Sequence, residues 1–531
     1  MGCAILAAVT ASRSTSINYR GELSADESEL LVQLERYDHD PIPWRSVDGS
    51  TIGPGNPWFL LLWRGLGWPM NYAGIHLLAA GLLGGIALLG YATVRLFLPA
   101  GFAACAGLAG VMAIAGCSAV DLLYFATELL PALALGAAVF ALVWARQKRP
   151  GANLMLLAAA LGSGAAPWAK LQAAPISLLL IGFAAWIART PAGSNGPART
   201  RFLIPVLVLA CALLPTVAML AVVGTAGAFP DFWASYVVAN LGYAGPLSAG
   251  DLVHRLLSLF QRSELNGLMA GLAALILLRV VAAGRRSATK TTLDPGIRML
   301  GWIYLGVALF ACIRPPHGFA HYDIFLIGPL IVALGLQLHG FGKAEAEAGL
   351  VPLDHWRAVL AVVCLLVPAG ALSLHHYREG GLLRAHLIRL QREADQSLAA
   401  VVSREIARIT PRAANMVVWG WMPKLYVQSG LRCATRQTNS HFLIDAGPSR
   451  EFIRRQFMQD VRAAEPDVIV DAVASDCFTW YWDVSSSRIE SFPEFAAYIG
   501  PRYTLALSVS GDQAGIPLRV FVKNPPAGPR P

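Results

Sequence analysis

The chain has 531 residues, of which 55% are apolar and only 14% are charged. This composition excludes an ordinary soluble protein, and the apolar residues gather in blocks that reach the roughly 20 residues needed to cross a bilayer. The formal net charge is +9. Because the lysines and arginines stand in short clusters between apolar blocks, the charge sets membrane orientation and does not indicate nucleic-acid binding. The sequence predicts a multi-pass membrane protein with no nucleic-acid partner.

The apolar run from Met1 to Ser12 is too short to span a bilayer. We interpret it as a shortened anchor helix, and we leave open whether the true start lies upstream. A cleaved signal peptide is the competing interpretation. Arg13 and Arg20 follow the run, and no Ala-x-Ala site is clear, so the anchor is favoured.

The first polar loop holds the acidic pair Asp26 and Glu27, with Glu29 close behind. A carboxylate at the membrane edge can act as a general base toward a hydroxyl group. The competing interpretation is structural: Ser24-Ala25-Asp26-Glu27 reads as a helix start with acids in the first turn, where the helix dipole stabilises them. Both interpretations stay open on the sequence pattern alone.

Apolar blocks of membrane length fill most of the chain up to residue 375. They lie at about 72–97, 100–118, 128–145, 152–169, 173–188, 202–224, 265–283, 299–313, 322–338 and 357–374. Alternate connections are rich in Lys and Arg, which predicts that they face the cytoplasm. The opposite connections, and everything after residue 375, are predicted to lie outside. With the N-terminal segment, about 10–11 transmembrane helices are expected.

Residues 376–531 have a different pattern, in which helical and strand signals alternate. Strands are expected at 416–421, 468–470, 505–509 and 519–522, and helices at 377–409, 452–464 and 492–499. We therefore predict two domains: a membrane domain over 1–375 and an α/β domain over 376–531. Cys433 and Cys477 would be able to pair if this domain faces an oxidising compartment.

Two outer turns carry charged residues beside the membrane. Asp121 and Glu128 flank one hairpin, and Lys170 and Gln172 lie in the next turn. A lysine at this depth is costly unless its ammonium reaches water or meets an anion. Lys170 is therefore either a snorkelling side chain or a contact for a phosphate.

A third outer turn groups Arg314, His317, His321 and Tyr322 before an apolar block. Arginine is suited to bidentate phosphate recognition, and the two prolines after Arg314 hold such a turn rigid. This grouping predicts a binding function. Acids and histidines on the same side of the membrane also leave binding of a divalent cation open. Because no pair has the spacing of metal ligands, no metal ligand is assigned.

In order and topology, these features resemble the GT-C superfamily of membrane glycosyltransferases. Within this superfamily the chain is most similar to the bacterial branch related to protein O-mannosyltransferases and lipid A aminoarabinose transferases. The resemblance covers residues 1–375. The motifs that carry it are Asp26-Glu27, Gly53-Pro54, Thr127-Glu128, Lys170-Leu171-Gln172 and His321-Tyr322.

The resemblance implies an α-helical polytopic enzyme with a GT-C-like fold, located in the bacterial inner membrane with its C-terminal α/β domain in the periplasm. It implies inverting transfer of a hexosyl or pentosyl group from a polyprenyl-phosphate donor to an envelope lipid, glycan or protein.

Site residues follow from the same resemblance. Asp26 matches the family's catalytic aspartate, and Glu27 is the second candidate. The residues implied for the donor phosphate are Lys170, Arg314, His321 and Tyr322. Those implied for substrate contacts are Asp121, Glu128, Gln172 and His317. Because the first helix is incomplete and Glu29 adds an acid, the identity of the base is open.

Two other functions remain to be weighed. A transporter or flippase of a lipid-linked or small solute should place ionisable residues near mid-membrane, and these apolar blocks are almost free of them. A non-catalytic scaffold would have no reason to gather acids and bases on one side. An enzyme acting at the outer membrane edge is the favoured interpretation.

Overall fold

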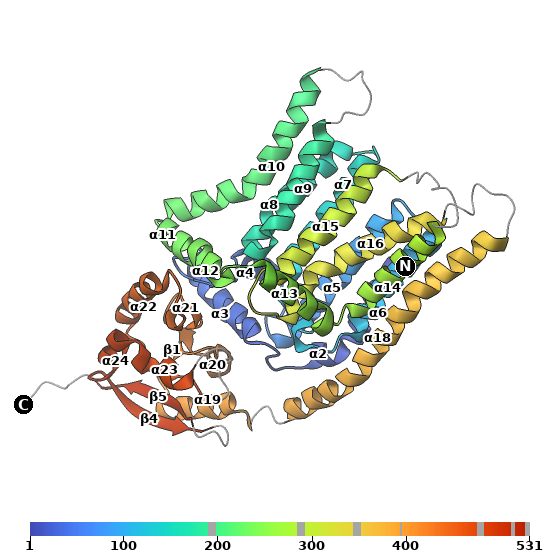
Figure 1. The fold of residues 1–531 in the computed structure, drawn as a ribbon. Coiled ribbons are helices and arrows are strands. Elements are labelled where there is room, and N and C mark those ends of the chain that lie inside the picture. The colour runs from blue at the N-terminus through green and yellow to red at the C-terminus, as the bar shows by residue number, and fades with distance from the viewer. Residues whose placement is uncertain are drawn as a thin grey trace, which may run out of the picture. The chain divides into compact units, whose positions relative to one another are not determined.

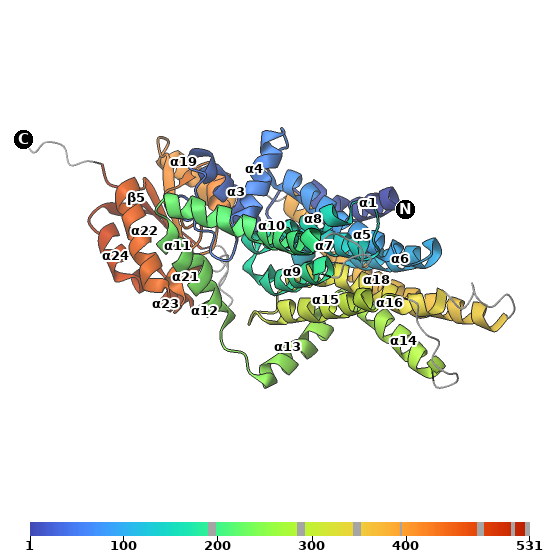
Figure 2. The same ribbon diagram turned by 90° about the horizontal axis from the view of Figure 1, so that it is seen from above.

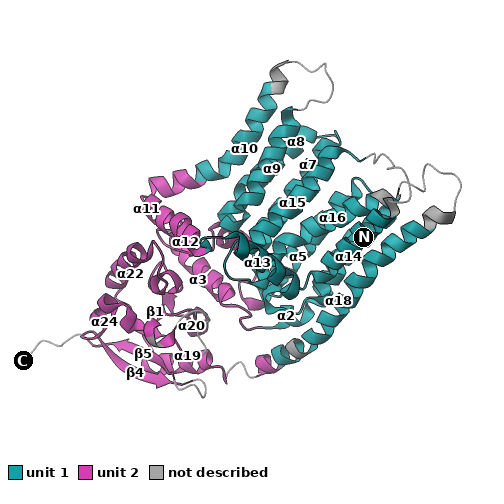
Figure 3. Ribbon diagram, viewed as in Figure 1, with its two compact units in different colours: residues 1–19, 73–218, 244–388 teal, residues 20–72, 219–243, 389–531 magenta. Residues whose placement is uncertain are grey.

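The computed structural model describes residues 1–189, 198–283, 293–342, 352–392, 396–474, 483–510 and 516–525. Figure 1 shows a largely helical chain, which divides into two compact units (Figure 3). Unit 1 comprises residues 1–19, 73–218 and 244–388, and unit 2 comprises 20–72, 219–243 and 389–531. The division differs from the predicted boundary at residue 375, because the first polar loop and residues 219–243 group with the C-terminal residues.

Unit 1 is built from apolar helices. Its N-terminal helices are α1 (Gly2–Ser12) and α2 (Ser14–Asn18). The longer ones are α5 (Tyr72–Arg95), α6 (Ala100–Gly116), α7 (Leu129–Arg146), α8 (Ala152–Ala169), α9 (Ala174–Arg189), α10 (Ala198–Thr225), α14 (Asn266–Ala283), α15 (Pro295–Ile313), α16 (Ile324–Gly342) and α18 (Pro352–Arg392). Shorter connections are η1 (Val120–Leu122), η2 (Leu171–Ala173), η4 (Ala320–Asp323) and α13 (Ala249–Arg262), whereas α12 (Asn240–Ala244) belongs to unit 2 except for its last residue.

The polytopic membrane fold is confirmed, with eight or nine described helices of spanning length where about 10–11 were predicted. Within the described residues, eight helices are long and apolar enough to cross a membrane, or nine if the bent pair of α13 and α14 forms one span. Helices α1 and α6 are apolar but shorter. Each predicted apolar block coincides with one of these helices, because a run of some 20 apolar residues leaves the backbone no better way to satisfy its polar groups in lipid.

Helix α16 is the central helix of unit 1 (Figure 2). All of the apolar window in Ala320–His339 is buried, compared with 22% of the window in Phe202–Thr225. Glycines let neighbouring helices approach it closely: a Cβ added to Gly110 would lie 2.5 Å from Cδ1 of Ile331. The amino end of this buried helix holds η4, and the adjoining helix ends present further polar residues.

Unit 2 contains a five-stranded sheet in the order β2-β1-β3-β5-β4. The strands are β1 (Asn415–Trp419), β2 (Arg432–Cys433), β3 (Val468–Asp471), β4 (Tyr503–Val509) and β5 (Leu518–Lys523). Strand β1 pairs in parallel with β2 and β3, whereas β5 is antiparallel to β3 and β4. The predicted strands and α/β character are confirmed, and β2 is an additional strand of two residues.

Helices cover both faces of this sheet. Those with residues in the two cores beside it are α3 (Ala25–His39), η3 (Trp233–Ala239), α19 (Leu398–Ile409), α20 (Lys424–Ser429), α21 (His441–Ile444), α22 (Arg450–Ala464), α23 (Val484–Ser487), η6 (Ile489–Ser491) and α24 (Pro493–Ile499). Helices α4 (Gly55–Gly65) and α11 (Phe229–Phe232) also belong to unit 2. Alternate residues of β1 enter different cores, since Met416 packs with residues of α3 and α19 and Trp419 packs with residues of α22 and α24.

Polar contacts tie the loop segments into unit 2. The guanidinium of Arg436 pairs with Asp231 and Asp460, at 2.8 Å in each case. Asn439 Nδ2 donates to Glu29 Oε2 over 2.8 Å. Cys433 is buried, and its predicted partner Cys477 lies outside the described residues.

Asp471 is expected to be a major stability determinant of unit 2. Its fully buried carboxylate accepts from Arg488 Nε at 2.9 Å and also pairs with Arg519. Asp471→Ala would leave two guanidinium groups without this partner, so it should lower the free energy of unfolding by about 3–5 kcal/mol. Thermal denaturation of the full-length protein measures this. Glu490→Gln removes an exposed partner of Arg519 and should cost less than about 1 kcal/mol; equal shifts for both variants would contradict the assignment.

Candidate functional site

Helix ends of unit 1 bring several predicted site residues together. Asp121 lies in η1, Glu128 immediately precedes α7, Lys170 follows α8, and His321 lies in η4. Successive apolar helices run in opposite directions, so the start of α7, the end of α8 and the start of α16 share one end of the unit. Connections far apart in sequence therefore build one polar cluster beside otherwise apolar helices.

Lys170 is a member of an ion pair. Its Nζ lies 3.1 Å from Glu128 Oε1 and donates to Thr127 Oγ1 over 2.9 Å. The side chain of Glu128 is fully buried, and that of Lys170 is only 9% exposed. The snorkelling interpretation of Lys170 is therefore wrong, because a nearby carboxylate and hydroxyl meet its ammonium instead of bulk water.

The imidazole of His321 lies between the carboxylates of Glu128 and Asp121. Its Nδ1 lies 3.0 Å from Asp121 Oδ1 and 3.1 Å from the Tyr124 hydroxyl, and its Nε2 lies 4.0 Å from Glu128 Oε1. The imidazole thus bridges Asp121 and Glu128, and it is itself buried. Two carboxylates, an ammonium and an imidazole meet at this helix end.

Both carboxylates of the cluster are held in the charged form. Burial acts to raise the pKa of Glu128, but the charges of Lys170 and His321 outweigh it and lower that pKa. Burial also opposes ionisation of Asp121, yet the hydrogen bond from His321 brings its pKa below the ordinary value. A cluster of this kind is ordered before any substrate arrives.

A second ion pair, which was not predicted from the sequence, lies next to the cluster. Arg262 Nη2 is 3.5 Å from Oδ1 of Asp323, which is fully buried two residues after His321. Arg262 ends α13, an amphipathic helix that exposes Val253, Leu257 and Phe260 on one side and bends by 105° into α14. The 3- and 4-residue spacing of these apolar residues would have predicted an amphipathic helix from the sequence. Nothing in the sequence would have predicted that Arg262 pairs with Asp323.

The remaining predicted residues of unit 1 have other partners. Arg314 donates to the carbonyls of Ala244 and Gly245, at 2.5 and 2.9 Å, and Gln172 Nε2 donates to Ala311 O over 2.7 Å. The Tyr322 ring meets the His321 ring edge to face at 4.6 Å. The ring of His317 lies 6.1 Å from that of Phe319. The donor-phosphate and substrate roles assigned to these four residues stay predictions.

The acidic pair lies in the first turn of α3, in unit 2. Ser24 is the N-cap, and its hydroxyl accepts the Asp26 N–H, so the helix-start interpretation describes the backbone. Glu27 is fully buried, and its Oε2 accepts the Leu23 N–H over 2.9 Å. Asp26 is half-buried. Of the pair, Asp26 is thus the acid with access to an incoming hydroxyl group.

Glu22 is a further acid beside this helix start. Its carboxylate accepts the hydroxyl of Ser28 and lies 4.0 Å from Lys424 Nζ. Burial raises the pKa of Glu22, with the negative charges of Glu27 and Asp26 adding to the shift. Glu22 differs from the other loop acids in its contacts with Ser28 and Lys424. These contacts form only in the folded chain, so the sequence pattern did not predict a role for Glu22.

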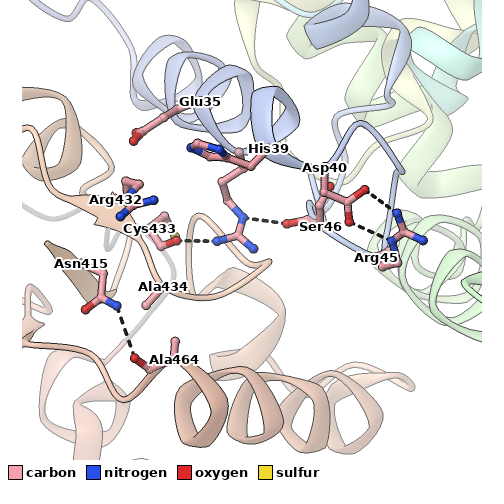
Figure 4. A pocket seen from close by; sticks show the side chains of 11 residues that line it. Glu35, His39, Asp40, Arg45, Ser46, Asn415, Arg432, Cys433, Ala434 and Ala464 are labelled. Carbon is pink, nitrogen blue, oxygen red and sulfur yellow. Dashed lines mark hydrogen bonds and ion pairs between the residues drawn. The ribbon is translucent and has the colours of Figure 1, made fainter.

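A pocket of about 400 Å³ also lies in unit 2 (Figure 4). Its residues come from the last turns of α3, the turn after it, and the beginnings of β1 and β2, and none of the predicted catalytic residues lines it. Throughout the described part of the chain, no group of three or more His, Cys, Asp or Glu has the arrangement of a metal site. The divalent cation stays an open prediction.

No protein-family model matches the chain, and no curated protein matches it by sequence. Solved structures do resemble it. ArnT from Cupriavidus metallidurans bound to undecaprenyl phosphate has a TM-score of 0.60 at 15% identity, and the match covers 99% of each chain. The same protein in the apo state gives 0.58 at 14% identity, again over 99% of each chain.

The archaeal oligosaccharyltransferase AglB from Archaeoglobus fulgidus, in complex with an inhibitory peptide and a dolichol-phosphate, is more distant. Its TM-score is 0.45 at 12% identity, over 97% of this chain and 75% of that one. The sequence predicted a polytopic helical membrane fold followed by an α/β domain, and the match to ArnT over the full length confirms it: this chain has the same fold as ArnT.

Proposed function

We propose that the protein is an inverting glycosyltransferase that moves a sugar from a polyprenyl-phosphate donor to a lipid, glycan or protein of the cell envelope. The observation that carries this proposal is the buried Lys170–Glu128 pair at a helix end, joined through His321 to Asp121. The match to ArnT bound to undecaprenyl phosphate supports a lipid phosphate as the ligand of such a chain.

Lys170 is the proposed contact for the donor phosphate. An ammonium has three N–H donors, and the described contacts of Lys170 are one hydrogen bond to Thr127 Oγ1 and one ion pair with Glu128. An N–H group therefore remains for a phosphate oxygen. Glu128 keeps the lysine charged and oriented, and the acidic side chains of the cluster provide acceptors for the hydroxyl groups of the donor sugar.

Asp26 is the proposed general base. It takes the proton from the acceptor hydroxyl as that oxygen bonds to the anomeric carbon, and the bond from this carbon to the phosphate oxygen breaks. The electron pair of the broken bond stays on the departing polyprenyl phosphate. Negative charge on the phosphate grows during this step, so the contact with Lys170 strengthens in the transition state.

The transporter alternative is less well supported. The charged residues of the cluster lie at the ends of apolar helices, with Glu128 just before α7 and Lys170 just after α8, whereas a transport pathway needs polar groups at mid-membrane. Proteoliposomes that contain a labelled polyprenyl-phosphate sugar separate the two functions. A glycosyltransferase moves the label to an acceptor, whereas a flippase leaves it on the lipid and changes only its leaflet.

The proposed reaction takes place on the periplasmic face of the inner membrane. Alkaline phosphatase, which is active only outside the cytoplasm, should therefore be active when fused after Arg392, the last residue of α18. The physical reason is the excess of Lys and Arg in the alternate connections, which predicts that they stay in the cytoplasm. A fusion that is expressed but inactive, while a cytoplasmic reporter at the same position works, would reverse the proposed orientation.

A further inference from the structure

Three arginines are among the residues that line the pocket in unit 2 (Figure 4). Arg36, Arg45 and Arg432 line it together with His39, and its carboxylates are Glu35 and Asp40. Three guanidinium charges against two carboxylates leave a net positive charge even when His39 is neutral. Its volume of about 400 Å³ falls within the range of pockets that hold small molecules or single units of larger ones.

Two of these arginines are fixed by the fold. Arg36 Nε donates to Ser46 O over 2.6 Å, and its Nη1 donates to Cys433 O, so the charged group spans from α3 to β2. Arg45 forms a two-pronged pair with Asp40, at 2.8 and 2.6 Å, and this pair lowers the pKa of Asp40. Asp40 is thus paired with Arg45, whereas the hydrogen bonds of the Arg36 side chain go to two carbonyls, and among the described residues no carboxylate forms an ion pair with it.

Arg432 has no such role in the fold. Among the described residues, no hydrogen bond or ion pair engages its guanidinium, and its side chain is exposed on the short edge strand β2. It adjoins Cys433, whose carbonyl accepts from Arg36. Arg36 and Arg432 line the same pocket, and neither has an ion-pair partner among the described residues. An anion stabilises this arrangement, because two like charges in a concave site repel each other until a shared counter-charge binds.

The alternative is that Arg432 is a solvated surface side chain with no role in binding. Two observations speak against it: its side chain lines a cavity, and it shares that cavity with an arginine that is held by backbone carbonyls from two different elements. Neutral polar groups also line the pocket: the Ser46 hydroxyl, which donates to Ile42 O, and the Asn415 amide, whose Nδ2 donates to Ala464 O. Guanidinium groups beside neutral polar groups suit an acidic sugar.

We infer that this pocket binds an anionic sugar unit, one that carries a phosphate or carboxylate group, between Arg36 and Arg432. Glu35 lies at the same wall and limits how much negative charge the pocket accepts. The pocket is distinct from the place where the proposed base acts, since Asp26 and Arg36 are ten residues apart on α3, or about 15 Å along a helix axis.

The role of the site in transfer rests on the proposed function. If the protein transfers a sugar to an envelope glycan or lipid, the pocket is a second subsite that holds an acidic unit of that acceptor away from the reacting hydroxyl group. A subsite of this kind lowers the KM for acidic acceptors and leaves turnover of neutral ones unchanged, because the contact is equal in the ground and transition states.

The direct test is calorimetric titration of the full-length protein in detergent with glucose 1-phosphate, glucuronate and neutral glucose. Binding of at least one of the two anions, and weaker binding of glucose, is expected. Comparing the two anions identifies the group that the arginines recognise. Arg432→Gln should weaken binding of that anion about 10-fold or more, since it removes a charged two-pronged donor. Glu35→Gln should tighten binding about threefold, since it removes a like charge from the pocket.

Arg412→Gln is the matched control, because Arg412 is an exposed arginine of the same unit that does not line the pocket. It should change affinity by less than about twofold. The opposite signs expected for Arg432→Gln and Glu35→Gln exclude misfolding as their common cause. Equal affinities of Arg432→Gln and the wild type, or no anion binding by the wild type, would overturn the inference. These titrations need no transfer activity, so failure of the proposed function would be seen separately.

Discussion

Replacement of Asp26 by asparagine is expected to lower turnover of sugar transfer by about 100-fold or more. Asparagine keeps the shape of the side chain but cannot accept the proton of an acceptor hydroxyl group. The half-buried side chain stands in the first turn of α3, and the Asp26 backbone N–H is the group that the Ser24 cap engages, so the helix start should survive the change. Initial rates at saturating donor and acceptor, together with the melting temperature, measure the effect.

Glu27→Gln is the control that separates the two acids. The buried Glu27 carboxylate accepts the Leu23 N–H, and an amide oxygen can accept the same bond. We therefore expect a modest change in stability and a turnover within about threefold of the wild type. Near-normal turnover of Asp26→Asn, or a larger loss for Glu27→Gln than for Asp26→Asn, would remove Asp26 as the base.

Loss of the Lys170 ammonium is expected to depress both donor affinity and turnover, the latter by about 100-fold, because the phosphate contact strengthens as the leaving group gains charge. Lys170→Gln alone is a poor test. It would leave the fully buried carboxylate of Glu128 without its main counter-charge, which typically costs about 3–5 kcal/mol of stability.

The double variant Lys170→Gln/Glu128→Gln avoids this problem. It replaces an ion pair by two amides of similar size that can bond to each other and to Thr127, so the melting temperature should stay close to that of the wild type. Binding of undecaprenyl phosphate, followed by its stabilisation of the purified protein, should nevertheless be lost. A double variant that still binds the lipid phosphate and turns over normally would reduce the pair to a structural role.

The sequence was sufficient for the membrane helices and for most of unit 2. A helix such as α7 is set by its own uninterrupted apolar residues, and β3 by the local run Val468–Val470. Strand β2, with two residues, has too little pattern of its own, and it exists because Arg432 and Cys433 pair with the neighbouring β1. The apolar block at 357–374 and the first part of the helix expected over 377–409 form one continuous helix, α18, which ends at Arg392; the last part of the expected helix is α19.

Part of the candidate site was predictable from the sequence. The charged residues at helix ends were visible because a charge beside an apolar block is conspicuous, and this identified Glu128, Lys170 and His321. Their pairing was not visible, since Lys170 and Thr127 are 43 positions apart and the Arg262–Asp323 pair connects positions still further apart. Sequence order likewise suggested one cluster around His317, His321, Tyr322 and Arg314, whereas only His321 joins the carboxylates directly.

Amino-acid composition does not predict that the first polar loop belongs to the same unit as the C-terminal residues. Residues 20–72 combine polar stretches with the apolar run 58–63, and their membership of unit 2 depends on specific bonds such as Arg36 to Cys433 and Asn439 to Glu29. Such bonds have sequence separations near 400 residues, and nothing local specifies them.

One measurement tests the proposed glycosyltransferase most directly. Purified wild-type protein in detergent is incubated with a polyprenyl-phosphate sugar, labelled in the sugar, and with a crude envelope fraction. We predict that label leaves the donor lipid and enters a lipid, glycan or protein acceptor, with one polyprenyl phosphate released for each sugar transferred, and that Asp26→Asn slows this about 100-fold. Label that stays entirely on the donor lipid, with folded wild-type protein and across a panel of donor sugars, would contradict the proposal.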